Sequence, residues 1–209
     1  MKIIFWGTPQ FAIPSIDAIT QSEHELIAVV TQPDKRRGRG KKHSSSPVKK
    51  RAEQLGLKIF TPEDIKKQSE IKNEIFAMEA DIYIVVAFGQ LLPTDVLDHP
   101  PLGCWNSHAS LLPRWRGAGP IQWSLLSGDR QTGVAIMSME QGLDTGPILS
   151  SRTLDIELLD NQNILTEKLS QISAELLLEA LYKIKLAGNG SKKMRLDKLG
   201  VVNQNDINI

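Results

Sequence analysis

Residues 104–123 read CWNSHASLLPRWRGAGPIQW and place polar, aromatic and turn-forming side chains at the end of a short apolar run. If this stretch begins as a strand, alternation puts the side chains of Asn106 and His108 on the same face. An amide donates hydrogen bonds without titrating, and an imidazole can donate from either nitrogen. Two such donors suit an oxygen that becomes negative during a reaction, which makes acyl transfer the first hypothesis.

Taken by itself, an Asn two residues before a His is more typical of a turn with satisfied polar side chains. The same holds for Asp144, which alone in Gly-Leu-Asp-Thr-Gly is more typical of a turn than of a catalytic group. Ser107 and Ser110 beside His108 raise the alternative of a hydrolase, but neither lies in the Gly-x-Ser-x-Gly turn that exposes a nucleophile.

The wider pattern narrows these alternatives, because its spacing matches a known family. The chain reads Asn106-x-His108-x-Ser110-Leu111-Leu112-Pro113, then Arg114-x-Arg116-Gly117, and later Gly142-Leu143-Asp144-Thr145-Gly146. This pattern resembles the folate-dependent formyltransferases over nearly the whole chain. Residues 114–123 are more similar to the branch of that family that modifies tRNA.

The resemblance implies roles for individual residues. Asn106 and protonated His108 would hold the developing oxyanion, and Asp144 would accept the proton that the attacking amine loses, directly or through water. Folate contacts would come from two segments, namely Ser110, Leu111, Leu112 and Pro113, and the loop of Phe88, Gly89, Gln90, Leu91 and Leu92. The reaction would move the formyl group of 10-formyltetrahydrofolate to the α-amino group of methionyl initiator tRNA in translation initiation, leaving tetrahydrofolate.

Composition describes an ordinary globular chain of 209 residues, with 41% hydrophobic and 23% charged residues. This length favours one large domain. The single Cys104 gives no disulfide framework, and four scattered His residues show no metal-ligand spacing, so no metal is expected. The absence of a signal-like opening and of a long apolar run favours a cytoplasmic protein that does not enter a membrane. We expect a monomer.

The positive charge is concentrated in one segment. Residues 34–51 carry nine Lys or Arg and one Asp, a net charge of +8, which leaves −7 for the rest of the chain. Residues 35–42 combine this charge with glycines and contain no apolar side chain, which predicts a mobile exposed loop. A basic arm on an acidic body suggests a polyanionic partner, although a solvated loop without a partner is the alternative. The resemblance implies contact with the tRNA acceptor stem through Arg36, Arg37, Arg39, Lys41 and Lys42.

Residues 2–31 predict a strand–helix–strand unit with a parallel sheet and a right-handed crossover. The turn Gly7-Thr8-Pro9 follows the first strand but lacks the further glycines that let a dinucleotide approach the backbone. NAD binding is therefore disfavoured. Residues 5–12 resemble the opening of the tRNA branch, except that Trp6 stands where a small residue is common.

Further elements follow from capping and periodicity. Ser46-Pro47 predicts a capped helix to about Leu55, and Thr61-Pro62 predicts the start of another helical region. The apolar run 82–87 predicts a strand at the centre of the sheet. The remaining expected elements are strands at 2–5, 26–31, 58–60, 104–106, 132–139 and from 147, and helices at 11–19, 120–126 and 163–186. The leucines of the last helix are expected in the core rather than in a dimer seam.

Together these features predict an α/β protein. The resemblance specifies a Rossmann-like formyltransferase fold, an open and mostly parallel sheet with helices on both faces. We expect residues 1–189 to form the catalytic domain, with the basic loop at 34–43. Residues 190–209 are expected to be a polar tail or the start of a linker to a β-barrel domain, so that the chain would be an amino-terminal fragment.

Two alternatives remain open at this stage. An enzyme of the same fold could act on a small amine, such as glycinamide ribonucleotide or an amino sugar, but it would not need the basic segment. A non-catalytic RNA-binding protein would not need Asn106, His108 and Asp144 together. The chain has both features.

Overall fold

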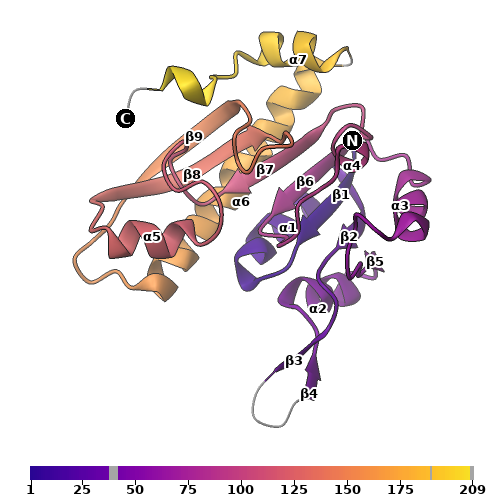
Figure 1. Cartoon of the computed structure of the whole chain (residues 1–209), viewed down its shortest axis with the longest axis horizontal. Coiled ribbons are helices and arrows are strands. Elements are labelled where there is room, and N and C mark those ends of the chain that lie inside the picture. The colour runs from indigo at the N-terminus through magenta and orange to yellow at the C-terminus, as the bar shows by residue number, and fades with distance from the viewer. Residues whose placement is uncertain (38–41, 189, 208–209) are drawn as a thin grey trace.

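A seven-stranded sheet forms the centre of the molecule, in the order β5-β2-β1-β6-β7-β8-β9 (Figure 1). The computed structural model describes residues 1–37, 42–188 and 190–207. The first five strands in this order, β5, β2, β1, β6 and β7, are parallel to one another. Strands β8 and β9 continue the sheet through antiparallel pairing. The strand bounds are β1 Lys2–Gly7, β2 Glu25–Val30, β5 Lys58–Phe60, β6 Ile82–Val86, β7 Cys104–His108, β8 Gln131–Ser138 and β9 Ile148–Asp155.

Helices cover both faces of this sheet, as predicted. One apolar core lies between the sheet and α1, α2, α5 and α6, and a second lies between the opposite face and α3 and α4. In the described residues no helix is both long enough and apolar enough to cross a membrane. The helical bounds are η1 Gln10–Ala12, α1 Ile13–Thr20, α2 Pro47–Gln54, α3 Ser69–Phe76, α4 Thr94–Leu97, α5 Pro120–Leu126, α6 Gln162–Ala187, α7 Lys192–Leu199 and η2 Gln204–Asp206.

Strand β6 is the central strand that its apolar run predicted. It pairs with β1 on one side and β7 on the other, and every one of its residues is buried. Ile82, Ile84 and Val86 contribute to the core beneath α6, whereas Tyr83 and Val85 contribute to the opposite core. A strand buried on both faces needs apolar residues at successive positions rather than alternation.

Strand β7 extends further than predicted. The expected end near Asn106 is wrong by two residues, because pairing with β8 continues to His108, opposite Ala135. Cys104 belongs to the core beneath α3 and α4, and Trp105 belongs to the core beneath α6. Alternation from Cys104 therefore places Asn106 and His108 on one face, at the carboxyl end of the strand.

The helical region predicted after Thr61-Pro62 exists as α3, but its predicted start is wrong, since α3 begins only at Ser69. Asp64 instead caps an isolated turn: its carboxylate accepts from the backbone N–H of Lys66, at 3.0 Å, and its carbonyl accepts from the N–H groups of Lys67 and Gln68. These bonds close a local turn.

The basic segment forms a ribbon rather than only a loop. Strands β3 (Lys35–Arg37) and β4 (Lys42–Ser44) pair antiparallel and project from the body beside α2 (Figure 1). Backbone hydrogen bonds between two strands need no buried apolar side chain, so the composition of this segment did not predict the strand pair. The tip with Arg39 and Lys41 lies outside the described residues, and so do the side chains of Arg36, Arg37 and Lys42.

The predicted cap of α2 is confirmed. The Ser46 hydroxyl accepts from the backbone N–H of Lys49, at 3.0 Å, and pairs with the hydroxyl of Thr31, at 2.8 Å. The Lys49 ammonium donates to Asp34, at 2.9 Å, where the chain enters the ribbon. The base of the ribbon is thus attached to α2 by an ion pair.

The C-terminal segment, residues 190–207, folds back onto the sheet. Helix α7 is followed by a bridge in which Val202 and Ile148 exchange both backbone hydrogen bonds. In Figure 1 this segment crosses beside β8 and β9. The expected polar tail or linker therefore has ordered structure in the described residues.

The leucines of α6 provide a test of the core. Leu177 is 1% exposed, whereas Leu186 on the same helix is 69% exposed. Leu177→Ala should lower the free energy of unfolding by about 2–5 kcal/mol, because it leaves a cavity beneath the sheet. Leu186→Ala should change it by less than about 0.5 kcal/mol. Denaturant unfolding of both variants makes the comparison, and equal losses would contradict this placement of α6.

Candidate functional site

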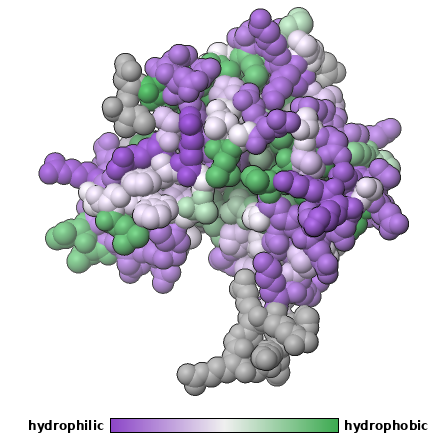
Figure 2. Space-filling model, viewed as in Figure 1, coloured by the Kyte–Doolittle hydropathy of each residue, from purple (hydrophilic) through white to green (hydrophobic). Residues whose placement is uncertain are grey.

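A cavity of about 650 Å³ opens at the carboxyl ends of β6 and β7. Its walls come from the turn after β1, the loop after β6, residues 106–109, residues 117–122 and the loop 139–144. Figure 2 shows an apolar hollow near the centre of this face, with hydrophilic residues around it. Open α/β sheets bind their ligands at this edge, because the loops that follow parallel strands converge there.

The carboxylate of Asp144 joins three segments of the chain in this cavity. One of its oxygens accepts from the side-chain amide of Asn106, at 3.0 Å. The other accepts from the backbone N–H of Gly117, at 2.8 Å, and lies 3.6 Å from Nδ1 of His108. The three residues predicted to be catalytic are thus in contact. Asn106 and His108 are 8% and 7% exposed, and the Asp144 side chain is 12% exposed, so water contributes little to this network.

The orientation of His108 is set by a backbone carbonyl. Nε2 lies 2.9 Å from the carbonyl oxygen of Trp115. Because a carbonyl can only accept, Nε2 carries a hydrogen and Nδ1 faces the carboxylate of Asp144. A doubly protonated ring would meet an acceptor at each nitrogen. The prediction that His108 acts as a donor therefore applies to Nδ1.

Backbone strain is concentrated around the same network. Ala87, Trp115 and Asp144 have φ angles of 51°, 59° and 51°, and Glu79 is the remaining non-glycine residue with positive φ in the described chain. Ala87 lines the cavity, and Trp115 and Asp144 supply the carbonyl and the carboxylate that flank His108. Non-glycine residues persist in this region only where surrounding contacts hold them, and such residues cluster at functional sites.

The loop that carries Asp144 requires a glycine at its end. A Cβ added to Gly146 would lie 1.8 Å from the backbone oxygen of Ser138. Since both groups are backbone, neither can move aside without shifting the loop or strand β8. Gly146 thus allows the close approach that brings Asp144 back over the sheet.

Asp129 anchors the turn that contains Trp115. Its carboxylate accepts two hydrogen bonds from the guanidinium of Arg114, at 2.6 and 3.0 Å, and one from Nε1 of Trp115, at 2.7 Å. The Trp115 ring also stacks on Trp123, with centroids 5.9 Å apart. The hydrogen bonds from Arg114, followed by the one from Trp115, lower the pKa of Asp129 against the opposing effect of burial.

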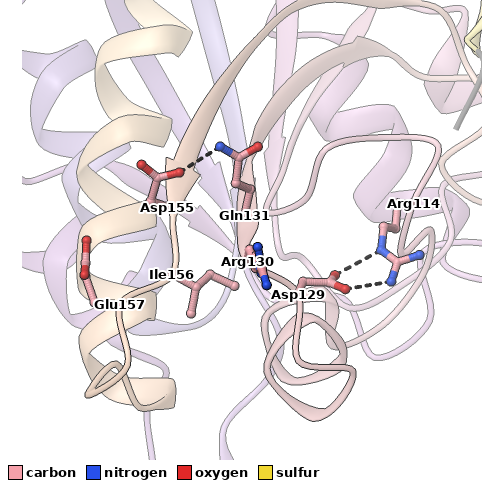
Figure 3. A pocket seen from close by; sticks show the side chains of 7 residues that line it. All are labelled: Arg114, Asp129, Arg130, Gln131, Asp155, Ile156 and Glu157. Atoms are coloured by element: carbon pink, nitrogen blue, oxygen red, sulfur yellow. Dashed lines mark hydrogen bonds and ion pairs between the residues drawn. The ribbon is translucent and has the colours of Figure 1, made fainter.

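A shallow depression beside this anchor is a weaker candidate for a reaction site. Figure 3 shows that Arg114 pairs with Asp129 and that Gln131 donates to Asp155 across the depression. Arg130, Ile156 and Glu157 complete its lining. Four of the polar groups thus form two pairs, and none of the lining residues is a histidine, serine or cysteine that could start nucleophilic chemistry.

The predicted folate segment 110–113 does not line the cavity. Ser110 is fully buried and donates to the carbonyl of Arg114, at 2.6 Å. Leu112 packs in a small core with Met137 and Ile148. Leu111 and Pro113 likewise lie outside the lining. Ser110 thus contacts the turn and Leu112 packs against the sheet, and the folate contacts of 110–113 stay a prediction.

The other predicted folate segment does line the cavity. All five residues of 88–92 contribute, and Leu91 is the most exposed of its apolar residues, at 55%. Phe88 and Leu92 are mostly buried in the core. The Gln90 amide binds away from the cavity, accepting from the N–H of Ile65, at 2.9 Å, and donating to the carbonyl of Pro62, at 3.0 Å. Gln90 therefore fixes the loop.

Several lining residues were not predicted. They include Pro9 and Phe11 after β1, Val85 and Met137 from the sheet, and Met139, Gln122, Gln162 and Thr166. The position of Pro9 after the first strand was a signal that could have placed it at this edge. Gln162 and Thr166 lie at the start of α6, and nothing in their local sequence indicates that this helix end reaches the cavity.

The described residues near the cavity contain no activated side-chain nucleophile. Burial raises the pKa of the Cys104 thiol, which donates to the carbonyl of Val96. The hydroxyl of Ser107 pairs with that of Ser173, at 2.7 Å, and not with His108. Within residues 1–37, 42–188 and 190–207, His, Cys, Asp and Glu side chains form no group of three that could hold a metal ion. The geometry fits stabilisation of charge and proton transfer.

Comparison with known proteins identifies the family. A family model described as formyl transferase matches residues 1–181. Methionyl-tRNA formyltransferase of Synechococcus sp. (strain WH7803) is 55% identical over 204 residues, which are 98% of this chain and 60% of that protein. The chain thus spans about three fifths of the length of this relative.

Solved structures share the fold at lower identity. Phosphoribosylglycinamide formyltransferase from Bacillus halodurans superposes with a TM-score of 0.73 at 19% identity, covering 90% of this chain and 96% of that one. WlaRD, a sugar 3N-formyl transferase, superposes with a TM-score of 0.72 at 20% identity, covering 100% of this chain and 68% of that one. At these identities the likeness concerns the fold.

The contribution of the Asp129 carboxylate to stability can be tested by its dependence on pH. Its folded-state pKa is lowered, so its ionised form stabilises the fold above the ordinary carboxyl pKa of about 3.9. This contribution is lost as the pH falls through the lowered value. Asp129→Asn should therefore be less stable than wild type at pH 7, and the difference should shrink below about pH 4.

Urea unfolding between pH 3 and 7 measures this difference, with the exposed Asp98→Asn as the control that should show none. A difference that stayed constant down to pH 3 would contradict a role for the charge of Asp129.

Proposed function

The chain belongs to the formyl transferase family, and we propose that it transfers the formyl group of 10-formyltetrahydrofolate to the α-amino group of methionyl initiator tRNA. The observation that carries this proposal is the buried contact of Asn106, His108 and Asp144 at the cavity. The 55% identity to a methionyl-tRNA formyltransferase supports the choice of substrate. The proposed reaction belongs to translation initiation, and we propose a cytoplasmic location for it.

The cavity fits a folate. Its volume of about 650 Å³ lies within the range of about 300–1,000 Å³ typical of small-molecule sites. Apolar side chains such as Val85, Leu91 and Met137 line it beside a few polar groups, which suits a flat heterocycle with polar edges. Bound 10-formyltetrahydrofolate would supply a formyl carbon for the amine to attack and a nitrogen that leaves with a proton. The loop 88–92 is proposed to hold it.

Asn106 is proposed to stabilise the negative charge on the formyl oxygen. One N–H of its amide donates to Asp144, and the amide carries a second N–H that remains for the substrate. The bond to Asp144 fixes the amide before the reaction, so that no reorganisation is needed when charge develops. At 8% exposure the amide acts in a site with little competing water.

His108 and Asp144 are proposed to manage protons. The amine must lose a proton as it forms its new bond, and the second lone pair on an Asp144 oxygen can accept it, directly or through water. His108 lies between the Trp115 carbonyl and Asp144, so a proton on Nδ1 can be shared with the carboxylate or with the substrate oxygen. No Ser or Cys nucleophile is required, because the amine itself attacks.

The basic ribbon is proposed to bind tRNA phosphates. Residues 34–51 hold a net charge of +8, whereas the rest of the chain sums to −7. Lys and Arg in such a segment attract a nucleic acid and release its counterions. We propose Arg36, Arg37, Arg39, Lys41 and Lys42 as the phosphate-binding residues.

The catalytic proposal predicts the effect of removing one charge. Asp144→Asn keeps the shape of the side chain but removes the proton acceptor, and it should lower the formylation rate by ~10²–10³, as should His108→Ala and Asn106→Ala. Mass spectrometry of methionyl initiator tRNA after incubation with formyl-folate measures the product.

Asp160→Asn is the matched control, since Asp160 pairs with Lys168 and does not line the cavity. Folate binding should persist in all four variants. Near-native turnover in the three site variants would refute the catalytic assignment. A parallel incubation with glycinamide ribonucleotide tests the small-amine alternative, and preference for it would replace tRNA as the substrate.

The tRNA proposal predicts a change in salt dependence. Replacing Arg39, Lys41 and Lys42 by Gln should weaken tRNA binding and leave folate binding intact. Each lost phosphate contact should flatten the log–log salt slope by about 0.7–0.9. The triple variant of Lys66, Lys183 and Lys193, all exposed, changes the net charge equally and serves as the control. Equal effects of the two triple variants would indicate that only net charge matters.

A further inference from the structure

A glutamine in the C-terminal segment connects the two chain segments that form the candidate active site. The side chain of Gln204 is 2% exposed. Its Nε2 donates to the backbone carbonyls of Asp144, at 2.9 Å, and Gly146, at 2.7 Å. Its Oε1 accepts from Nε of Arg116, at 2.8 Å. Both N–H groups and the carbonyl of this amide are therefore engaged.

The two segments joined by Gln204 also meet inside the cavity. Gly117, next to Arg116, donates its N–H to the Asp144 carboxylate. Trp115, on the other side of Arg116, supplies the carbonyl that holds Nε2 of His108. Gly117 and Trp115 thus bind the side chains of the proposed catalytic residues, whereas Gln204 binds the backbone carbonyls of the Asp144 loop.

This backbone needs external support. Asp144 has a φ of 51° and Trp115 a φ of 59°, conformations that non-glycine residues keep only when their surroundings hold them. Gln204 bonds the carbonyl of Asp144 itself and that of the residue two positions later. A single amide therefore fixes the loop on both sides of Thr145.

The position of Gln204 is itself fixed by ordered structure. Val202 and Ile148 exchange backbone hydrogen bonds of 2.8 and 2.9 Å, and the side chain of Asn203 accepts from the N–H of Asn205, at 3.0 Å. Lys192 in the same segment donates to the carbonyl of Met139, at 3.1 Å, at the start of the Asp144 loop. This segment lies beyond residue 181, where the match to the family model ends.

We propose that Gln204 is a positioning residue that holds the Asp144 loop against the Trp115–Gly117 turn, so that the C-terminal segment sets the geometry of the catalytic carboxylate. Its effect on catalysis rests on the proposed formyl transfer. Gln204 does not reach the substrate, because it acts on backbone groups behind Asp144.

Two substitutions separate the interactions of this amide. Gln204→Met keeps the length of the side chain and removes all three hydrogen bonds. Gln204→Glu keeps an acceptor for Arg116 but loses both donors to the carbonyls of Asp144 and Gly146. Asn205→Ala, an exposed residue of the same turn, is the control.

Both Gln204 variants should lower kcat by roughly 10- to 100-fold, as expected when catalytic groups are displaced by a fraction of an ångström to an ångström. KM for formyl-folate should change much less, because the 88–92 wall is untouched. The control should match wild type. Assays run well below the unfolding temperature of each variant separate this effect from loss of folded protein. Unchanged kcat in folded Gln204→Met would overturn the proposal.

A double-mutant cycle tests whether Gln204 acts through Asp144. In the Asp144→Asn background, Gln204→Met should have little further effect on kcat, since the group that it positions is already inactive. A purely structural role for Gln204 would instead lower kcat by the same factor in both backgrounds. That result would overturn the proposal.

A spectroscopic measurement tests the positioning without any activity. The ring nitrogen resonances of His108 in ¹⁵N-labelled protein should shift in Gln204→Met in the same direction as in Asp144→Asn, and Asn205→Ala should leave them in place. Unchanged His108 resonances in Gln204→Met would overturn the proposal. If wild type formylated no tRNA, the proposed function would fail, and this measurement would still decide the role of Gln204.

Discussion

The structure around the cavity depends on a buried carboxylate that must have donors. Asp144 lies in a site from which water is largely removed, so an unpaired charge there would be costly. The chain satisfies it with an amide from β7 and a backbone N–H from the turn after residue 113, and Nδ1 of His108 lies 3.6 Å from the same carboxylate. Asn106 and His108 both belong to β7, and Gly117 belongs to the turn. The position of any one of them is therefore coupled to the positions of the others.

The fold brings these segments together by combining regular pairing with local strain. Pairing of β7 with β8 to the level of His108 fixes the two side chains on the sheet, and the close approach at Gly146 returns the loop after β8 over it. Trp115 is held by its ring, through Asp129, and presents its carbonyl to His108. Positive φ angles at Trp115 and Asp144 cost energy locally, and the hydrogen bonds to their neighbours offset that cost.

The parts of this arrangement that sequence could predict are those governed by local rules. Alternation placed Asn106 and His108 on one face, and the continuous apolar run identified β6 as the central strand. Sequence failed where distant contacts decide. The turn at Asp64 replaced a predicted helix start, and Leu112 packs against β8 and β9 and does not line the cavity. Local sequence rules could not identify Gln204, because its side chain donates to backbone carbonyls that lie about sixty residues earlier in the chain.

The basic ribbon and the buried network around Asp144 lie in different parts of the molecule. Interactions in the buried network at the cavity are strengthened because water is excluded, whereas the charge of a basic ribbon acts through solvent and is screened by salt. Figure 1 shows the ribbon projecting from the body beside α2, away from the C-terminal segment that supports Asp144. If a nucleic acid carries the reacting amine, the ribbon governs how often the substrate arrives, and the Asp144 network governs what happens once the amine is in the cavity. Changes in the two regions should then add independently, because they share no described contact and act on different steps.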